Sequence, residues 1–125
     1  MVIWTPSVVL AQLLAQGRKP PDSETLVSSR LLEYELWIRI YARRLYESHG
    51  ELARPLIGRL ALLELAPPVL ARALGPFPTP VWTLDTLHLA SIEFLRQNGQ
   101  SVRLESYDGR MVECARKLMV PLYRL

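Results

Sequence analysis

The sequence predicts an α/β protein with three layers, α/β/α, in which a central parallel sheet of four to five short strands lies between two layers of helices. Short apolar runs of strand length alternate along the chain with longer segments whose apolar residues recur at helical spacing. Polar or proline-containing junctions separate these segments. Alternation of this kind is typical of parallel sheets whose strands are joined by helices on both faces.

Composition indicates a single globular domain over residues 1–125. Half of the residues are hydrophobic and 22% are charged, which argues against a disordered chain. No apolar run approaches the roughly 20 residues of a membrane span, and the N-terminal segment does not read as a secretory signal. We therefore expect a cytoplasmic protein with no membrane partner. The lone Cys114 has no partner for an internal disulfide, so we expect it to fill space.

Each predicted element follows from its residue pattern. The expected strands are 2–4, 24–28, 61–65, 101–104 and a short last strand at 120–123. The expected helices are 6–17, 30–48, 51–60, 67–74, 84–97 and one that follows Asp108, with a proline-rich loop at 18–22. Helix 30–48 is expected to end at His49 and Gly50.

Four of these helices begin with capping chemistry. Thr5 before Pro6 is a suitable N-cap with proline at the first helical position. Ser28 or Ser29, Thr83 and Asp108 are the expected caps of three later helices. Asp85 then falls in a first helical turn, where a carboxylate is favourable because it faces the positive end of the helix dipole.

Glu35 is the exception on its helix. Leu31, Ile38, Ala42 and Leu45 form an apolar stripe at helical spacing, and Glu35 lies inside this stripe. A charged residue on an apolar face indicates a special role, because burying a charge is costly. The alternative is an ion pair with Arg39, one helical turn further on.

Several acids should meet at one edge of a parallel sheet. Thr5, Asp85 and Asp108 all stand at helix starts, and Glu35 lies on the inward face of its helix. Carboxylates that converge repel one another unless a cation lies between them, and oxygen ligands suit Mg²⁺ or Mn²⁺. Such an ion can polarise a phosphodiester and activate a bound water.

The charge balance fits a nucleic-acid substrate. The chain has 15 basic and 12 acidic residues, with a formal charge of +3, so the three candidate acids would lie in a basic surround. Arg39, Arg43 and Arg110 are the cations best placed to contact phosphate, although a solvated helix face explains them almost as well.

The motifs resemble those of the PIN-domain family, and within it the VapC-like ribonuclease toxins. Leu-Asp-Thr-Leu-His-Leu-Ala at 84–90 is similar to the family's Leu-Asp-Ala-Leu-His-Leu-Ala. Tyr-Asp-Gly-Arg-Met at 107–111 resembles its Tyr-Asp-Arg-Arg segment. The stretch 28–35 resembles its second motif, and 7–10 matches the end of its opening motif. The resemblance covers essentially the whole chain.

The resemblance implies an endoribonuclease that depends on Mg²⁺ or Mn²⁺ and forms the toxin component of a toxin–antitoxin system. Its catalytic and metal-ligating residues would be Glu35, Asp85 and Asp108. The implied partners are RNA, a cognate antitoxin protein and a second copy of the chain in a homodimer.

One departure from the family concerns the opening acid, which falls on Thr5. A neutral hydroxyl is a weaker metal ligand, and Ser7 is the other auxiliary hydroxyl. Asp22 and Glu24 precede the second strand and therefore belong to the opposite edge of the sheet, so neither replaces the acid. The alternative function is a degenerate PIN domain, weakly active or inactive, that binds a protein or RNA.

Other candidate residues have structural explanations. We expect His88 to be buried and hydrogen-bonded rather than to act as a general base. Trp4, Trp37 and Trp82 are expected in the core or at an interface, with base stacking as the alternative. A phosphate-handling small-molecule enzyme is disfavoured because no Gly-rich loop follows a predicted strand.

Overall fold

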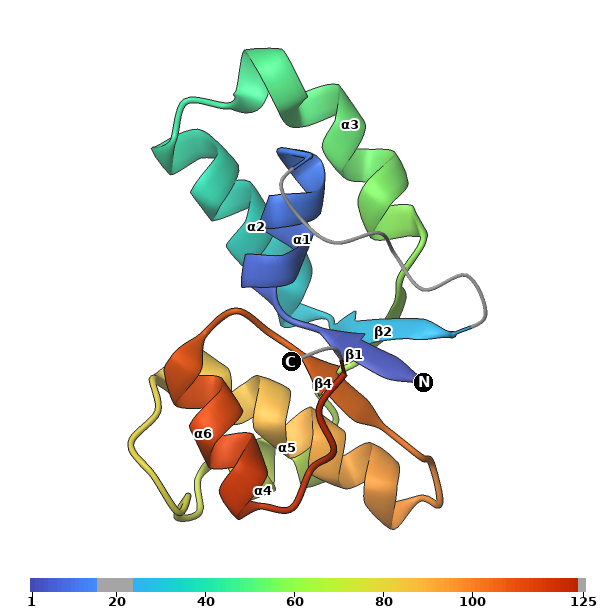
Figure 1. Ribbon diagram of the computed structural model, residues 1–125, viewed down its shortest axis with the longest axis vertical. Coiled ribbons are helices and arrows are strands. Elements are labelled where there is room, and N and C mark those ends of the chain that lie inside the picture. Colours follow the sequence, from blue (N-terminus) through green and yellow to red (C-terminus); the bar gives the residue numbers. More distant parts are fainter. Residues whose placement is uncertain (16–23, 124–125) are drawn as a thin grey trace.

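The computed structural model describes residues 1–15 and 24–123, and its centre is a parallel sheet of four strands in the order β3-β2-β1-β4. The strands are β1 (Val2–Trp4), β2 (Leu26–Ser29), β3 (Ala61–Leu63) and β4 (Arg103–Glu105). Two groups of helices lie on opposite sides of this sheet (Figure 1). One group is α1 (Pro6–Leu13), α2 (Leu31–Ala42) and α3 (Tyr46–Gly58). The other is α4 (Pro67–Ala73), α5 (Thr83–Gln97) and α6 (Gly109–Lys117). The predicted three-layer α/β/α fold is confirmed.

The order of the strands locates a topological switch point. From β1 the chain moves outward to β2 and β3, and then returns to the other side of β1 to form β4. Trp4 pairs with Glu105 in the register of β1 and β4, so both strands end at the same level. In open α/β sheets, ligands bind outside the carboxyl ends of the strands where the order reverses. We call this end of the sheet the carboxyl edge and the other end the amino edge.

Alternate side chains of the strands divide between two cores. Val2 and Trp4 of β1 pack with the layer of α1, α2 and α3. Ile3 packs on the opposite face with side chains of α5 and α6, including the buried Cys114. None of the helices in the described ranges is long and apolar enough to cross a membrane.

The single helix expected over 30–48 is wrong, because the chain turns between α2 and α3. Arg44 has φ +56°, and its amide donates to the carbonyl of Tyr41 at 3.1 Å. The amide of Leu45 donates to the carbonyl of Ile40 at 2.8 Å, which completes a Schellman-type ending. His49 and Gly50 consequently lie inside α3. The turn forms without glycine because Leu45 gains packing against the core.

The expected stripe on α2 is also wrong, by about one residue. The buried apolar face consists of Leu32, Leu36 and Ile40, whereas Ile38 is 66% exposed. Glu35 is nevertheless buried on this face, as expected.

Smaller differences concern the ends of elements. The first helix ends at Leu13, and the rest of its expected range with the loop at 18–22 lies largely outside the described residues. Trp82, rather than Thr83, is the N-cap of α5. Strand β2 is shifted toward Ser29 from the expected 24–28. The expected last strand is reduced to one parallel bridge between Leu104 and Leu122.

A candidate acidic site at the carboxyl edge

Glu35 enters the site from α2 and is held by a histidine. Its Oε1 lies 2.5 Å from Nε2 of His88 on α5, so His88 replaces the Arg39 ion pair that was the alternative. The other ring nitrogen of His88 lies 3.2 Å from Oγ of Ser29, which itself accepts the amide of Leu31. These two contacts hold the imidazole ring between α2 and the end of β2. The prediction that His88 is buried and hydrogen-bonded is confirmed, since it is 1% exposed.

Asp85 lies in the first turn of α5, beside the other two acids. Its Oδ2 accepts the backbone N–H of Trp82 at 3.3 Å. Burial raises the pKa of Asp85, and the neighbouring charges of Asp108 and Glu35 raise it further. The Trp82 amide and His88 act in the opposite direction. The electrostatic influence of both acids on Asp85 indicates that the three carboxylates share one region.

Asp108 is the N-cap of α6, as expected. Its Oδ1 accepts the amides of Arg110 at 3.0 Å and Met111 at 3.5 Å. The amide of Asp108 in turn donates to Oγ of Ser106 at 3.1 Å. These bonds fix the orientation of the carboxylate at the end of β4.

Thr5 and Ser7 connect the end of β1 to the loop that carries Asp108. Their hydroxyl oxygens lie 3.2 Å apart, and the amide of Tyr107 donates to Oγ of Ser7 at 3.0 Å. Thr5 occupies the N-cap position of α1, but its side chain makes no capping hydrogen bond, contrary to expectation. The hydroxyl of Thr5 is therefore used within the carboxyl edge.

Glu105 is a carboxylate that the sequence analysis missed. It is the last residue of β4, it is 2% exposed, and its Oε1 accepts the indole N–H of Trp4 at 2.8 Å. The expected strand 101–104 stops one residue short of Glu105, and no role was predicted for this residue. The alternation of side chains along a strand could have identified it, because Glu105 pairs with Trp4 and points to the same face of the sheet. Its bond with Trp4 gives it a structural role beside Thr5.

Two of the expected phosphate-binding arginines line a common groove. A hollow of about 220 Å³ is lined by Ser7, Leu10, Ala11, Leu14, Arg39, Arg43 and Tyr107. We call it the arginine groove. Two of its lining residues, Ser7 and Tyr107, are hydrogen-bonded to each other, so the groove reaches the loop that carries Asp108. Arg110 lies apart from it, with its guanidinium carbon 4.7 Å from the ring centroid of Trp82.

Whether these carboxylates can hold a divalent cation depends on how many protein ligands the ion requires. Among residues 1–15 and 24–123, no group of three or more His, Cys, Asp or Glu side chains is close enough to hold a metal ion. Glu35 is turned toward His88. Mg²⁺, however, is commonly held by only one or two protein carboxylates, with waters and substrate phosphate completing its shell. Asp85 and Asp108 fit that requirement, while the three-carboxylate set stays a prediction.

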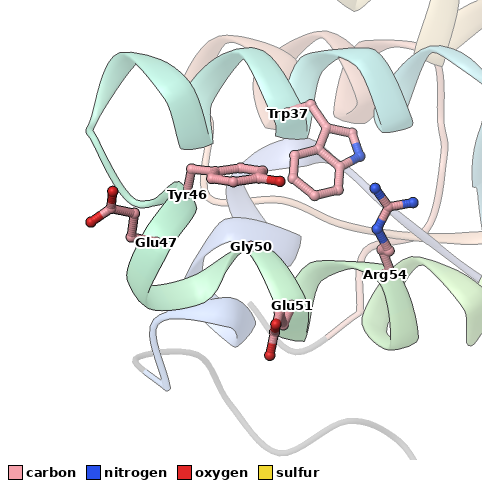
Figure 2. A pocket seen from close by; sticks show the side chains of 6 residues that line it. All are labelled: Trp37, Tyr46, Glu47, Gly50, Glu51 and Arg54. Atoms are coloured by element: carbon pink, nitrogen blue, oxygen red, sulfur yellow. The ribbon is translucent and has the colours of Figure 1, made fainter.

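A second pocket, of about 380 Å³, lies between α2 and α3 and is lined by Trp37, Tyr46, Glu47, Gly50, Glu51 and Arg54. Figure 2 shows the rings of Trp37 and Tyr46 beside one another, with Arg54 next to Trp37. Glu47 and Glu51 point away from the rings in this view. Trp37 follows Glu35 by two residues, roughly 200° around the helix. This aromatic pocket therefore faces away from the acids.

Comparison with known proteins adds no family to this description. The sequence matches no protein-family model and no curated protein. The resemblance to PIN domains accordingly stays a prediction, and the functional assignment depends on the geometry of the carboxyl edge.

Proposed function

We propose that this protein is a metal-dependent endoribonuclease whose active site is the carboxyl edge of the sheet. The observation that carries the proposal is that Asp85 of α5 interacts electrostatically with Asp108, at the start of α6, and with Glu35 of α2. Among the described residues no arginine or lysine forms an ion pair with Asp85 or Asp108. Acids arranged in this way at a switch point favour a bound cation.

The residues of the site have distinct roles in this proposal. Asp85 and Asp108 would hold Mg²⁺ or Mn²⁺, and each is oriented by backbone amides at a helix start. The ion, when bound, would polarise the phosphodiester and lower the pKa of a water. Glu35 would position that water, and His88 fixes the Glu35 carboxylate for this purpose. Such preorganisation is valuable because small displacements of reacting groups slow catalysis strongly.

RNA is the proposed substrate because cations adjoin the acids. Arg39 and Arg43 line the arginine groove next to Ser7 and Tyr107, and Arg110 lies two residues after Asp108. The formal charge of +3 is consistent with a polyanionic partner. Two planar guanidinium groups in one groove suit bidentate contacts with successive phosphates.

We also propose that the protein is the toxin of a toxin–antitoxin pair, that it binds a cognate antitoxin protein and that it forms a homodimer. Support for a protein partner comes from α2, where Tyr34 is 64%, Ile38 66% and Tyr41 60% exposed. Apolar side chains clustered on one helix and left in solvent are typical of interaction surfaces. This surface is separate from the acids, because Glu35 lies on the buried face of the same helix.

Thr5 favours a second candidate function, a degenerate domain that binds a partner without cleaving RNA. The resemblance places an acid at this position, whereas the structure places a buried hydroxyl bonded to Ser7. Loss of one carboxylate weakens affinity for a divalent cation.

A cleavage assay separates the two candidates. Mixed RNA is incubated with Mn²⁺ or Mg²⁺ and the wild-type protein, Asp85→Asn, Thr5→Asp, or Glu113→Gln, which changes an exposed acid on α6. We expect metal-dependent cleavage by the wild type, a loss of at least about 100-fold in Asp85→Asn and a gain in Thr5→Asp. Glu113→Gln should match the wild type.

The outcome that contradicts the proposal is the absence of cleavage by all four proteins together with no shift of the melting temperature by Mn²⁺. Cation binding to the folded state must raise the melting temperature, so an unchanged value would leave no role for the acids in metal binding. The binding-module function would then replace the nuclease.

A further inference from the structure

Trp82 is a large aromatic residue exposed beside the acids. It is the N-cap of α5, and its backbone N–H donates to Oδ2 of Asp85 at 3.3 Å. The residue is 64% exposed, unlike Trp4, which is completely buried. Neither core packing nor the capping role of its backbone accounts for an indole in this position. A ring exposed three residues from a site acid is available to a ligand.

Arg110, in the first turn of α6, contacts the ring of Trp82. Its guanidinium carbon lies 4.7 Å from the centroid of the Trp82 ring, a cation–π contact. Trp82 directly precedes the helix that carries Asp85, and Arg110 follows Asp108 by two residues. The contact therefore joins the two segments that present these carboxylates, and it restricts the motion of both side chains.

We propose that Trp82 and Arg110 form a stacking subsite for one unpaired nucleobase of a single-stranded RNA, next to the phosphate that Asp85 and Asp108 address. This inference rests on the proposed nuclease function. Every nucleobase presents a π-face, so stacking on an indole needs no particular base. The planar guanidinium of Arg110 extends the stack and also presents N–H donors to an adjoining phosphate.

The position of the subsite defines a path for the strand. The arginine groove reaches Tyr107 on one side of Asp108, and the Trp82–Arg110 pair begins two residues beyond it. A strand that crosses Asp108 would thus contact Arg39 and Arg43 through its phosphates and Trp82 through a base. Base faces within a duplex are covered by their neighbours, so the subsite should select single strands over duplexes.

Binding is best measured without cleavage, in chelator-containing buffer that holds no divalent cation. The probe is a fluorescently labelled single-stranded RNA of about ten nucleotides, a length within the usual site size. Its affinity is determined by fluorescence anisotropy, and the tryptophan emission of the protein is followed in a parallel titration with the unlabelled RNA. The same RNA in duplex form and a single-stranded DNA of equal sequence complete the set.

We expect Trp82→Ala to weaken binding of the single strand by at least about 5-fold, the lower end for loss of one stacked base. Trp82→Phe should restore affinity because phenylalanine also stacks, but it should abolish most of the quenching of tryptophan emission. Arg110→Ala should weaken binding as well. The controls are Leu74→Ala, which removes a more exposed apolar side chain at the end of α4, and Arg59→Ala, at the amino edge.

The inference is overturned if Trp82→Ala binds as tightly as the wild type, if quenching persists in Trp82→Phe, or if the duplex binds as well as the single strand. Equal affinity for DNA would retain the subsite but extend it to single strands of either sugar. Failure of the nuclease function has a different signature. If the base stacks but RNA is not cleaved with Mn²⁺, the stacking subsite is retained and the nuclease function is rejected. If RNA is cleaved but no base stacks, the nuclease function is retained and the subsite is rejected.

Discussion

At the amino edge of the sheet, Glu24 forms ion pairs with the Met1 ammonium at 2.8 Å and with the guanidinium of Arg103. At the carboxyl edge, Asp85 lies near Asp108, and neither carboxylate has an arginine or lysine ion-pair partner among the described residues. Only strands of three or four residues separate the two edges of the sheet. The two edges therefore lie close together in the fold, and they differ in whether a cationic side chain accompanies the acid.

The difference separates structural acids from candidate functional ones. A carboxylate with a cationic neighbour is stabilised in its charged form, as at Glu24. A buried carboxylate beside like charges is destabilised in its charged form, and the raised pKa of Asp85 expresses that cost. Arrangements of this kind are more frequent at functional sites than elsewhere. In the proposed function an external cation would balance the acids of the carboxyl edge, whereas Glu24 is paired within the chain.

The largest effect on stability is expected from His88→Leu. This change leaves Glu35, which is only 7% exposed, without its partner on α5. Removing one member of a buried hydrogen-bonded pair leaves a carboxylate that water cannot solvate fully. We expect the free energy of unfolding, measured by urea denaturation at pH 7, to fall by about 3 kcal/mol.

The control for this change is the double variant Glu35→Leu with His88→Leu, which removes both polar groups. It should recover much of the loss, because an apolar pair of similar size leaves no unsatisfied carboxylate. If the double variant is less stable than His88→Leu alone, Glu35 does not depend on His88, and the division between the two edges loses one of its main supports.

Asp85→Asn should change stability in the opposite direction. The pKa of Asp85 is raised from its ordinary value of 3.8, so the folded protein binds more protons than the unfolded chain between that value and the raised one. Stability from this group therefore falls as the pH rises through that interval. Asparagine keeps an oxygen that can accept the Trp82 amide but carries no charge. The variant should be more stable than the wild type at pH 7, by less than the loss in His88→Leu.

Urea denaturation as a function of pH tests this sign. The advantage of Asp85→Asn should shrink as the pH is lowered toward 3.8, where the wild-type carboxyl becomes neutral. Glu113→Gln, at an exposed position on α6, serves as the control and should show no such trend. A variant that is less stable than the wild type throughout would mean that favourable helix-dipole interactions outweigh the repulsion from Asp108 and Glu35.

Sequence reasoning located the carboxyl edge because its signals are local. Strand and helix periodicity defines the alternation, and capping chemistry places Asp85 and Asp108 at helix starts without knowledge of the tertiary structure. These elements were therefore predictable, apart from boundary shifts, the turn that divides the expected helix 30–48 and the last strand, which is reduced to one bridge. The roles of Glu35, Asp85 and Asp108 stay predictions, since sequence and geometry both leave the chemistry to experiment.

The contacts that the sequence did not predict are between distant segments or lack a residue-type signal. Glu35 and His88 are 53 residues apart, so neither residue alone indicates the other. The turn at Arg44 uses a left-handed backbone without glycine or asparagine, which are the residues that normally mark such a turn. The contact of Trp82 with Arg110 likewise depends on how α5 and α6 pack together.

The smallest effect is expected from Glu24→Gln at the amino edge. Its side chain is 20% exposed, and partly solvated ion pairs contribute little, so the free energy of unfolding should fall by about 1 kcal/mol or less and by less still at high salt. The Mn²⁺-induced rise in melting temperature should equal that of the wild type, because β1 separates Glu24 from the acids by about 10 Å. Asp85→Asn should lose that rise. A Glu24→Gln protein that also loses its response to Mn²⁺ would show that the two edges are coupled, since a change in the pairing of the strand starts would then alter the acids at their ends.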